Sequence, residues 1–191
     1  EVHLPVAVKI SPYYSSLASF LVGLQDAGAA GVVMFNRFYS PDLDMETLEV
    51  TPRISLSSTT ELRLPLRWIG IGREFLRMSI AGSTGVHSGR DAAKLILACA
   101  DVAMTASAPS FHGASHMSTS AHERREWMRD HGYQHVNEMR GAARRDAVAD
   151  PSAYERANYI GNLTSFTSRF LSSHDARTGR RDLVHASGFT Q

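Results

Sequence analysis

Residues 6–12 read Val6-Ala7-Val8-Lys9-Ile10-Ser11-Pro12, and this run decides the class of fold. The segment is apolar except for Lys9, and the Ser-Pro pair ends it. An almost continuously apolar strand is typical of a parallel sheet that is covered on both faces. A lysine near the carboxyl end of such a strand either faces the mouth of a binding site or snorkels into solvent. This segment alone leaves both interpretations open.

The same pattern recurs three times along the chain. The expected strands are residues 6–10, 32–36, 77–82 and 101–106. Apolar side chains at helical spacing predict helices between them, over residues 16–24, 59–69 and 89–99. Pro65 lies inside the second of these helices and implies a late start or a kink. Strands that alternate with helices favour a parallel sheet with right-handed crossovers, either an open doubly wound sheet or a barrel.

Two regions depart from this pattern. Residues 37–58 are polar and contain two short alternating pieces, 47–50 and 53–56, which predict an inserted hairpin or lid. After Ser107 the chain turns more polar, and we expect further helices over 123–129, over 133–141 and from Asp150 onward. The last residues are polar and basic. We therefore expect one domain over residues 1–166 and a disordered tail over 167–191.

Composition excludes several classes of function. The 191-residue chain is 43% hydrophobic with a formal net charge of +1, so we expect a globular protein and no nucleic-acid partner. No apolar run approaches the roughly 18 to 20 residues that span a bilayer, so we expect no membrane contact and a cytoplasmic location by default. The single cysteine, Cys99, excludes a disulfide framework and fits a packing role. The histidines lack the spacing of metal ligands, so no metal is expected.

Small residues follow the third and fourth expected strands. Gly82-Ser83-Thr84-Gly85-Val86 comes after one of them and Ala106-Ser107-Ala108 after the other. Barrels commonly bind a phosphate between their last two loops, where small residues and a helix N-terminus let backbone N–H groups approach the oxygens. Gly85 and Ser107 are therefore phosphate candidates. The alternative is that both are ordinary strand-to-helix turns.

Two nearby polar residues have simpler interpretations. Asp91 lies in the first turn of the expected helix, where a carboxylate complements the helix dipole, and we assign it no catalytic role. His87 lies beside the glycine loop and could face a ligand, but we interpret it as a surface histidine. Neither residue is needed for the phosphate hypothesis.

Asn36 ends the second strand much as Lys9 ends the first, so both would project into the mouth of a barrel. An amide offers a donor and an acceptor together, which suits the edge of a flavin ring or a planar carbonyl substrate. The cation of Lys9 could stabilise negative charge on a reduced ring. The alternative for Asn36 is a side chain that bonds to its own turn.

These residues carry a family resemblance. The chain resembles the C-terminal half of the class 1 dihydroorotate dehydrogenases, the cytosolic class of that family. The matching segments are residues 6–13, 33–39, 61–68, 84–87, 100–104 and 154–159. The resemblance covers residues 4 to 166, and the strand ends at Lys9 and Asn36 are its most specific parts.

The resemblance implies half of a (β/α)8 barrel that holds FMN at the carboxyl ends of its strands. It places Lys9 near the flavin ring, Asn36 near flavin and substrate, and Thr84, Gly85, Ala106 and Ser107 at the phosphate. It implies oxidation of dihydroorotate to orotate, a step of pyrimidine biosynthesis, by hydride transfer to the flavin. The catalytic base is expected upstream of this chain, which begins at Glu1 and suggests a fragment that alone is inactive. A small-molecule substrate and a homodimer are the expected partners.

The chain departs from the family at both loops. Thr84-Gly85 stands where the related enzymes show Gly-Gly, and Ala106-Ser107 stands where they show Gly-Thr. Only one asparagine of the substrate-binding type, Asn36, can be placed. Two alternatives stay open: a non-catalytic half-barrel relic, or another phosphate-binding barrel enzyme in which Lys9 forms a Schiff base.

Overall fold

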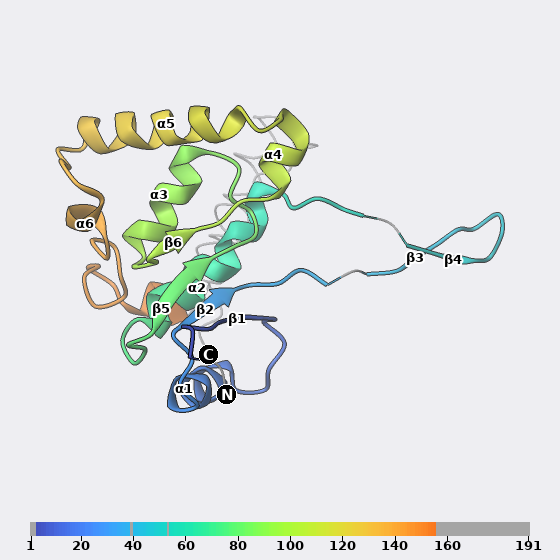
Figure 1. Ribbon diagram of the computed structural model, residues 1–191, viewed down its shortest axis with the longest axis horizontal. Coiled ribbons are helices and arrows are strands. Elements are labelled where there is room, and N and C mark those ends of the chain that lie inside the picture. The colour runs from blue at the N-terminus through green and yellow to red at the C-terminus, as the bar shows by residue number, and fades with distance from the viewer. Residues whose placement is uncertain (1–2, 39, 53, 156–191) are drawn as a thin grey trace, which may run out of the picture. The chain divides into compact units, whose positions relative to one another are not determined.

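The protein is described by a computed structural model, which covers residues 3–38, 40–52 and 54–155. Four parallel strands form one sheet in the order β1 (Ala7–Ile10), β2 (Gly31–Met34), β5 (Ser79–Gly82) and β6 (Val102–Ala103) (Figure 1). All four expected strands are present, although each is shorter than predicted. Within the described residues β1 and β6 each pair with one neighbour, so both edges of the sheet are open.

Helices connect the strands where the sequence predicts them. The first crossover contains α1 (Leu17–Asp26), the second contains a 3-10 turn η1 (Thr59–Leu62) that runs into α2 (Arg63–Gly72), and the third contains α3 (Gly89–Leu97). Ser58 begins η1, and its backbone N–H donates to Glu61 Oε2 over 2.6 Å. Pro65 lies in the first turn of α2, where a missing N–H costs little. The expected late start is therefore what occurs.

The two faces of the sheet differ in burial. Cα partners in the parallel register place Val8, Val32 and Ile80 side by side, and on the same face Met34 is fully buried in the core. Because side chains alternate along a strand, Lys9, Val33, Ala81 and Val102 share the opposite face. Lys9 is exposed there, and Val102 is 50% exposed. The more open face is the one that would line the interior of a closed barrel.

Four helices follow the sheet within the described residues. They are α4 (Ser107–His112), α5 (His116–Asp130), α6 (Val136–Met139) and α7 (Ser152–Glu155). Helix α5 is twice as long as the sequence predicts, and it packs across α3. Gly89 makes this contact possible, because a Cβ there would lie 2.2 Å from the Ser120 carbonyl oxygen. The expected tail at 167–191 and the end of the predicted domain lie outside the described residues.

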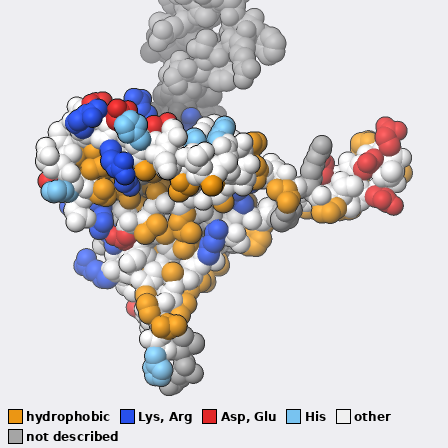
Figure 2. Space-filling model, turned by 45° about the horizontal axis from the view of Figure 1, so that its top comes forward, with side chains coloured by type: hydrophobic (Ala, Val, Ile, Leu, Met, Phe, Trp, Pro, Cys, Tyr) orange, Lys and Arg blue, Asp and Glu red, His pale blue; other side chains and the backbone are white. Residues whose placement is uncertain are grey.

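The inserted hairpin exists, but its strands are not the predicted ones. Strands β3 (Asp42–Leu43) and β4 (Val50–Thr51) pair antiparallel and extend away from the sheet (Figure 1). The turn is fixed by Asp44, whose Oδ1 accepts N–H groups from Glu46 and Thr47 at 2.9 and 3.0 Å. These N–H groups, Thr47 first, hold the pKa of the Asp44 carboxyl below its usual range. Figure 2 shows that acidic side chains gather on this hairpin.

Asp101 joins the start of β6 to the rest of the core. One carboxylate oxygen accepts the Ile80 N–H over 2.8 Å and forms an ion pair with Arg73, and the other accepts from Arg140 Nη1 over 3.2 Å. Arg73 also donates to the Cys99 carbonyl oxygen. A single carboxylate therefore ties α2, β5 and the segment after α6 to the strand β6. No helix among residues 3–155, where described, is long and apolar enough to cross a bilayer.

Candidate functional site

A pocket of about 190 Å³ lies at the carboxyl ends of the four strands. All six residues that the sequence assigns to the cofactor line it, although they come from four separate segments. The lining residues are Lys9, Phe35, Asn36, Arg37, Ser57, Ser83, Thr84, Gly85, Val86, Met104, Thr105, Ala106 and Ser107. The fold thus brings the two strand ends and the two small-residue loops to one place, and which ligand they bind remains a proposal.

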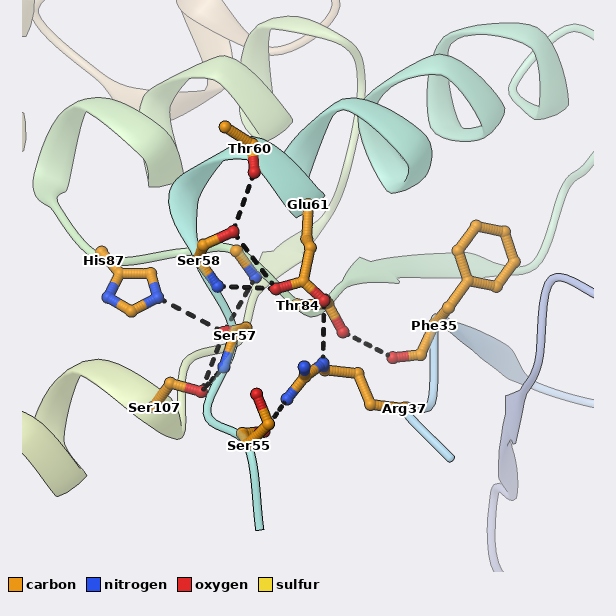
Figure 3. A network of polar contacts seen from close by, with 11 residues as sticks. Phe35, Arg37, Ser55, Ser57, Ser58, Thr60, Glu61, Thr84, His87 and Ser107 are labelled. Carbon is orange, nitrogen blue, oxygen red and sulfur yellow. Dashed lines mark hydrogen bonds and ion pairs between the residues drawn. The ribbon is translucent and has the colours of Figure 1, made fainter. Parts of the chain in front are cut away.

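The described lining of this pocket is basic, with no carboxylate among its side chains. Lys9 reaches it from β1 and forms no hydrogen bond or ion pair with the described part of the chain. Arg37 enters beyond β2, pairs with Glu61 at 3.0 Å, and donates to the Ser55 carbonyl oxygen (Figure 3). Because Glu61 balances the charge of Arg37, the uncompensated positive charge among the described lining residues is that of Lys9, and it favours an anionic ligand.

Asn36 follows β2 and is held through its backbone. Its N–H donates to the Ile10 carbonyl oxygen over 2.7 Å, which continues the contact between the two strands beyond Met34. Its side-chain amide makes no hydrogen bond within the described residues, so the turn-capping alternative is wrong. The amide is available to a ligand in the pocket.

The Thr84-Gly85 turn has a backbone that favours glycine at both positions. Thr84 has φ of 80° and Gly85 has φ of 78°. A branched residue at such φ is strained, and the hydrogen bond from Thr84 Oγ1 to the Phe35 carbonyl oxygen, at 3.0 Å, helps to hold it there. A Cβ on Gly85 would lie 2.3 Å from the Leu62 backbone nitrogen. Gly85 is therefore required by the close approach of η1 as well as by its own φ.

Ser57 is a site residue that the sequence did not indicate. It is only 6% exposed, and it bridges the two loops (Figure 3). Its N–H and its hydroxyl both donate to Ser107 Oγ, at 3.0 and 2.8 Å, while the Gly85 N–H donates to Ser57 Oγ at 3.4 Å. Ser57 and Ser58 lie directly before η1, and such a pair of serines is a capping signal. Nothing in the sequence points to the contact between Ser57 and Ser107, fifty residues away.

The structure corrects the interpretation of His87. Its side chain is half-buried, and Nε2 lies 3.3 Å from Ser57 Oγ. Helix α5 holds the loop from the other side, because His116 Nε2 lies 2.7 Å from the His87 carbonyl oxygen. Asp91 lies in the first turn of α3, as expected, and it also caps the helix by accepting N–H groups from His87 and Ser88. His87 is therefore a neighbour of the pocket rather than a surface residue.

Several backbone donors in the pocket are unpaired. Within the described residues the N–H groups of Thr84, Ala106 and Ser107 make no hydrogen bond. Such groups need an acceptor, and phosphate oxygens are suitable acceptors for clustered backbone N–H groups. Together with Lys9 and Arg37, they fit a phosphate-bearing ligand such as FMN.

The chain is similar to known proteins over part of their length. No family model matches the chain. A Pediococcus pentosaceus protein that carries the name dihydroorotate dehydrogenase A (fumarate) is 31% identical over 109 residues, 54% of this chain and 35% of that protein. The catalytic subunit of dihydroorotate dehydrogenase B (NAD(+)) from a Geobacter species is 27% identical over 143 residues, 72% of this chain and 46% of the subunit. The chain is dihydroorotate dehydrogenase-like.

A solved structure gives the fold of this dihydroorotate dehydrogenase-like chain. The crystal structure of DHODH from Eimeria tenella in complex with ferulenol superimposes with a TM-score of 0.59 at 18% identity, over 72% of this chain and 38% of that one. The expected fold class is confirmed: four parallel strands with their helices form an α/β half-barrel. The chain spans between about a third and just under half of the length of these relatives.

A larger cavity of about 310 Å³ lies near the other end of the strands of this dihydroorotate dehydrogenase-like fold, beside Arg73 and Arg77. Most of its charged side chains form structural ion pairs: Arg144 pairs with Asp146, Glu74 with Arg145, and Arg73 with Asp101. It contains no predicted site residue. We therefore place the candidate site in the smaller pocket, where the strand ends and loops meet.

Proposed function

We propose that the chain carries the FMN site of an oxidoreductase of the dihydroorotate dehydrogenase type. One observation supports this most strongly: Lys9, Asn36 and the two small-residue loops line a single basic pocket at the carboxyl ends of the strands. The relatives named above support the same class of reaction. Dihydroorotate as the substrate and a role in pyrimidine biosynthesis are part of the proposal.

In this proposal some residues of the pocket bind the phosphate of the cofactor and others contact its ring. The unpaired N–H groups of Thr84, Ala106 and Ser107 bind the phosphate, and Gly85 allows η1 to close over this loop. Asn36 positions a planar ring edge through its free amide. Lys9 places a cation where negative charge develops as the ring is reduced. When bound, FMN supplies an acceptor for the hydride of the dihydropyrimidine ring.

No lining residue is assigned the removal of the substrate proton. The pocket contains no carboxylate among its described lining side chains, and the hydroxyl groups of Ser57, Thr84 and Thr105 donate to partners within the protein. We therefore propose that the base comes from a part of the active enzyme that this chain does not contain. The chain alone then binds flavin without turning over substrate.

The test is a fluorescence titration of the full chain with FMN and with riboflavin. FMN is expected to bind at least about tenfold more tightly, because charge-assisted hydrogen bonds to phosphate are lost with riboflavin. Equal binding of both flavins would contradict a phosphate site. A chain that stays colourless and binds neither would support the non-catalytic relic instead.

Lys9→Met tests the ring end of the site. Loss of the cation is expected to weaken binding of the reduced flavin about tenfold relative to the oxidised form, which lowers the two-electron midpoint potential by about 30 mV. Lys94→Met is the matched control, because Lys94 lies on α3 and pairs with Asp91 at 3.3 Å away from the pocket lining. If the midpoint potential of the bound flavin is the same in both variants, Lys9 does not contact the flavin ring.

A further inference from the structure

The polar contacts behind the pocket form a chain of hydroxyl groups with a histidine at its far end. His87 lies against Ser57, Ser57 lies against Ser107, and of these three only the two serines line the pocket (Figure 3). The proposed function uses the backbone of this loop but not the imidazole. The inference below rests on the proposed function in taking a phosphate-type anion as the ligand.

Counting donors and acceptors fixes the direction of these hydrogen bonds. Ser107 Oγ already accepts two, from the Ser57 N–H and the Ser57 hydroxyl. A hydroxyl oxygen has two acceptor positions and one donor proton. The Ser107 proton is therefore left over, with no acceptor within the described residues, and it belongs to a residue that lines the pocket. In this arrangement Ser107 is a donor to whatever ligand is bound.

The state of His87 decides whether this arrangement holds. The Ser57 hydroxyl donates its proton to Ser107. Its oxygen therefore accepts the Gly85 N–H and, at 3.3 Å, a proton on Nε2 of His87. If Nε2 carries no proton, it becomes an acceptor for the Ser57 hydroxyl. Ser57 Oγ can then accept the Ser107 proton, and the pocket loses its hydroxyl donor. The imidazolium form has a proton on both nitrogens, so it excludes this second arrangement.

We propose that His87 is a positioning residue that acts through Ser57 to orient the Ser107 hydroxyl toward a phosphate-type anion, so that protonation of His87 tightens anion binding. Histidine is the side chain that changes charge between pH 5 and 8. The charge of the imidazolium and the orientation of the hydroxyl groups both favour an anion, so the two effects have the same sign. The predicted result is tighter binding at acidic pH.

Other charged groups also face His87. Asp91 accepts the His87 N–H at 3.2 Å, and His116 from α5 contacts its carbonyl oxygen. Asp101 and Arg124 line a cavity of about 270 Å³ that His87 shares. The ring of His112 lies 4.8 Å from that of His116, between ring centres. Histidine is the residue type among these groups whose ordinary charge change falls between pH 5 and 8, so the experiment needs a variant that separates the other two histidines from His87.

The experiment titrates the full chain with sulfate and follows the Ser107 amide signal by NMR at pH 5.5 and at pH 8.0. Sulfate is the probe because, unlike a phosphate ester, it does not change charge over this range. The wild-type chain is expected to bind sulfate about tenfold more tightly at the lower pH, the scale of one hydrogen bond to a charged group. Equal affinity at the two pH values would overturn the proposal.

Three variants assign the effect. The side-chain amide of His87→Gln donates at every pH, so this variant is expected to bind sulfate with the same affinity at both. Ser57→Ala breaks the connection and should bind weakly at both pH values. His116→Gln should show the same ratio of sulfate affinities at the two pH values as the wild-type chain. The proposal is wrong if the difference in sulfate affinity between pH 5.5 and pH 8.0 persists in His87→Gln or disappears in His116→Gln.

The flavin titrations keep this proposal separate from the proposed function. A pH-dependent sulfate affinity in a chain that binds neither FMN nor riboflavin would support the role of His87 and contradict the flavin site. FMN binding together with a sulfate affinity that is the same at both pH values would support the flavin site and contradict the role of His87.

Discussion

Gly85→Ala is expected to lower the free energy of unfolding by about 3 to 5 kcal/mol and to eliminate FMN binding. The reason is twofold. The residue has φ of 78°, where a side chain is strained, and the new Cβ would lie 2.3 Å from the Leu62 backbone nitrogen. Backbone cannot move aside as a flexible side chain can, so η1 must shift away from the loop. Chemical denaturation followed by circular dichroism measures the loss.

Gly23→Ala is the matched control for this substitution. Gly23 lies within α1, and a Cβ there meets nothing within 4 Å. Alanine in a helix interior is favoured over glycine by about 0.5 to 1 kcal/mol, so this variant should be slightly more stable than the wild type. A loss below about 1 kcal/mol for Gly85→Ala would mean that the loop and η1 do not pack as described.

Asp101→Ala is expected to cost about 2 to 4 kcal/mol of unfolding free energy. The substitution leaves Arg73 without its carboxylate, removes a partner of Arg140, and leaves the Ile80 N–H without an acceptor. Because these groups anchor β6, the loop that follows it and carries Ser107 should also lose order. Denaturation measures the stability, and an FMN titration measures the effect on the pocket.

The control for Asp101 is an exposed aspartate in a weaker pair. Asp130 lies 3.7 Å from Arg129, and both side chains are largely exposed. Solvent screens such a pair, so Asp130→Ala should change stability by no more than about 0.5 kcal/mol. Similar losses for the two variants would show that Asp101 does not tie the sheet together.

The sequence predicts the strands and the strand-end residues because their signals are local. Lys9 and Asn36 each interrupt or end an apolar run, and parallel strands bring their carboxyl ends to one edge. The small-residue loops are placed by the same rule. These features depend on the order of residues within one strand or loop, which is why the pocket could be expected before its geometry was known.

Contacts between distant segments could not be predicted in this way. Ser57 lies in an insertion without periodic hydrophobicity, and its role depends on Ser107, fifty residues away. The hairpin strands are set by the turn around Asp44 rather than by the alternation at 53–56. Helix α5 is too polar for its apolar residues to predict where it begins and ends. Its packing against α3 depends on the space left by the missing side chain of Gly89. In each case the deciding partner is remote in sequence.

The central claim is that a phosphate-bearing flavin binds where the strand ends and the two loops meet. The most direct test is a comparison of amide NMR signals of the isotope-labelled chain with and without FMN. We expect the signals of Thr84, Gly85, Ala106 and Ser107 to shift together, while the signal of Gly23 in α1 stays in place. Shifts confined to residues around the other cavity, such as Gly70 and Arg77, or no shift of the four loop amides, would contradict the account.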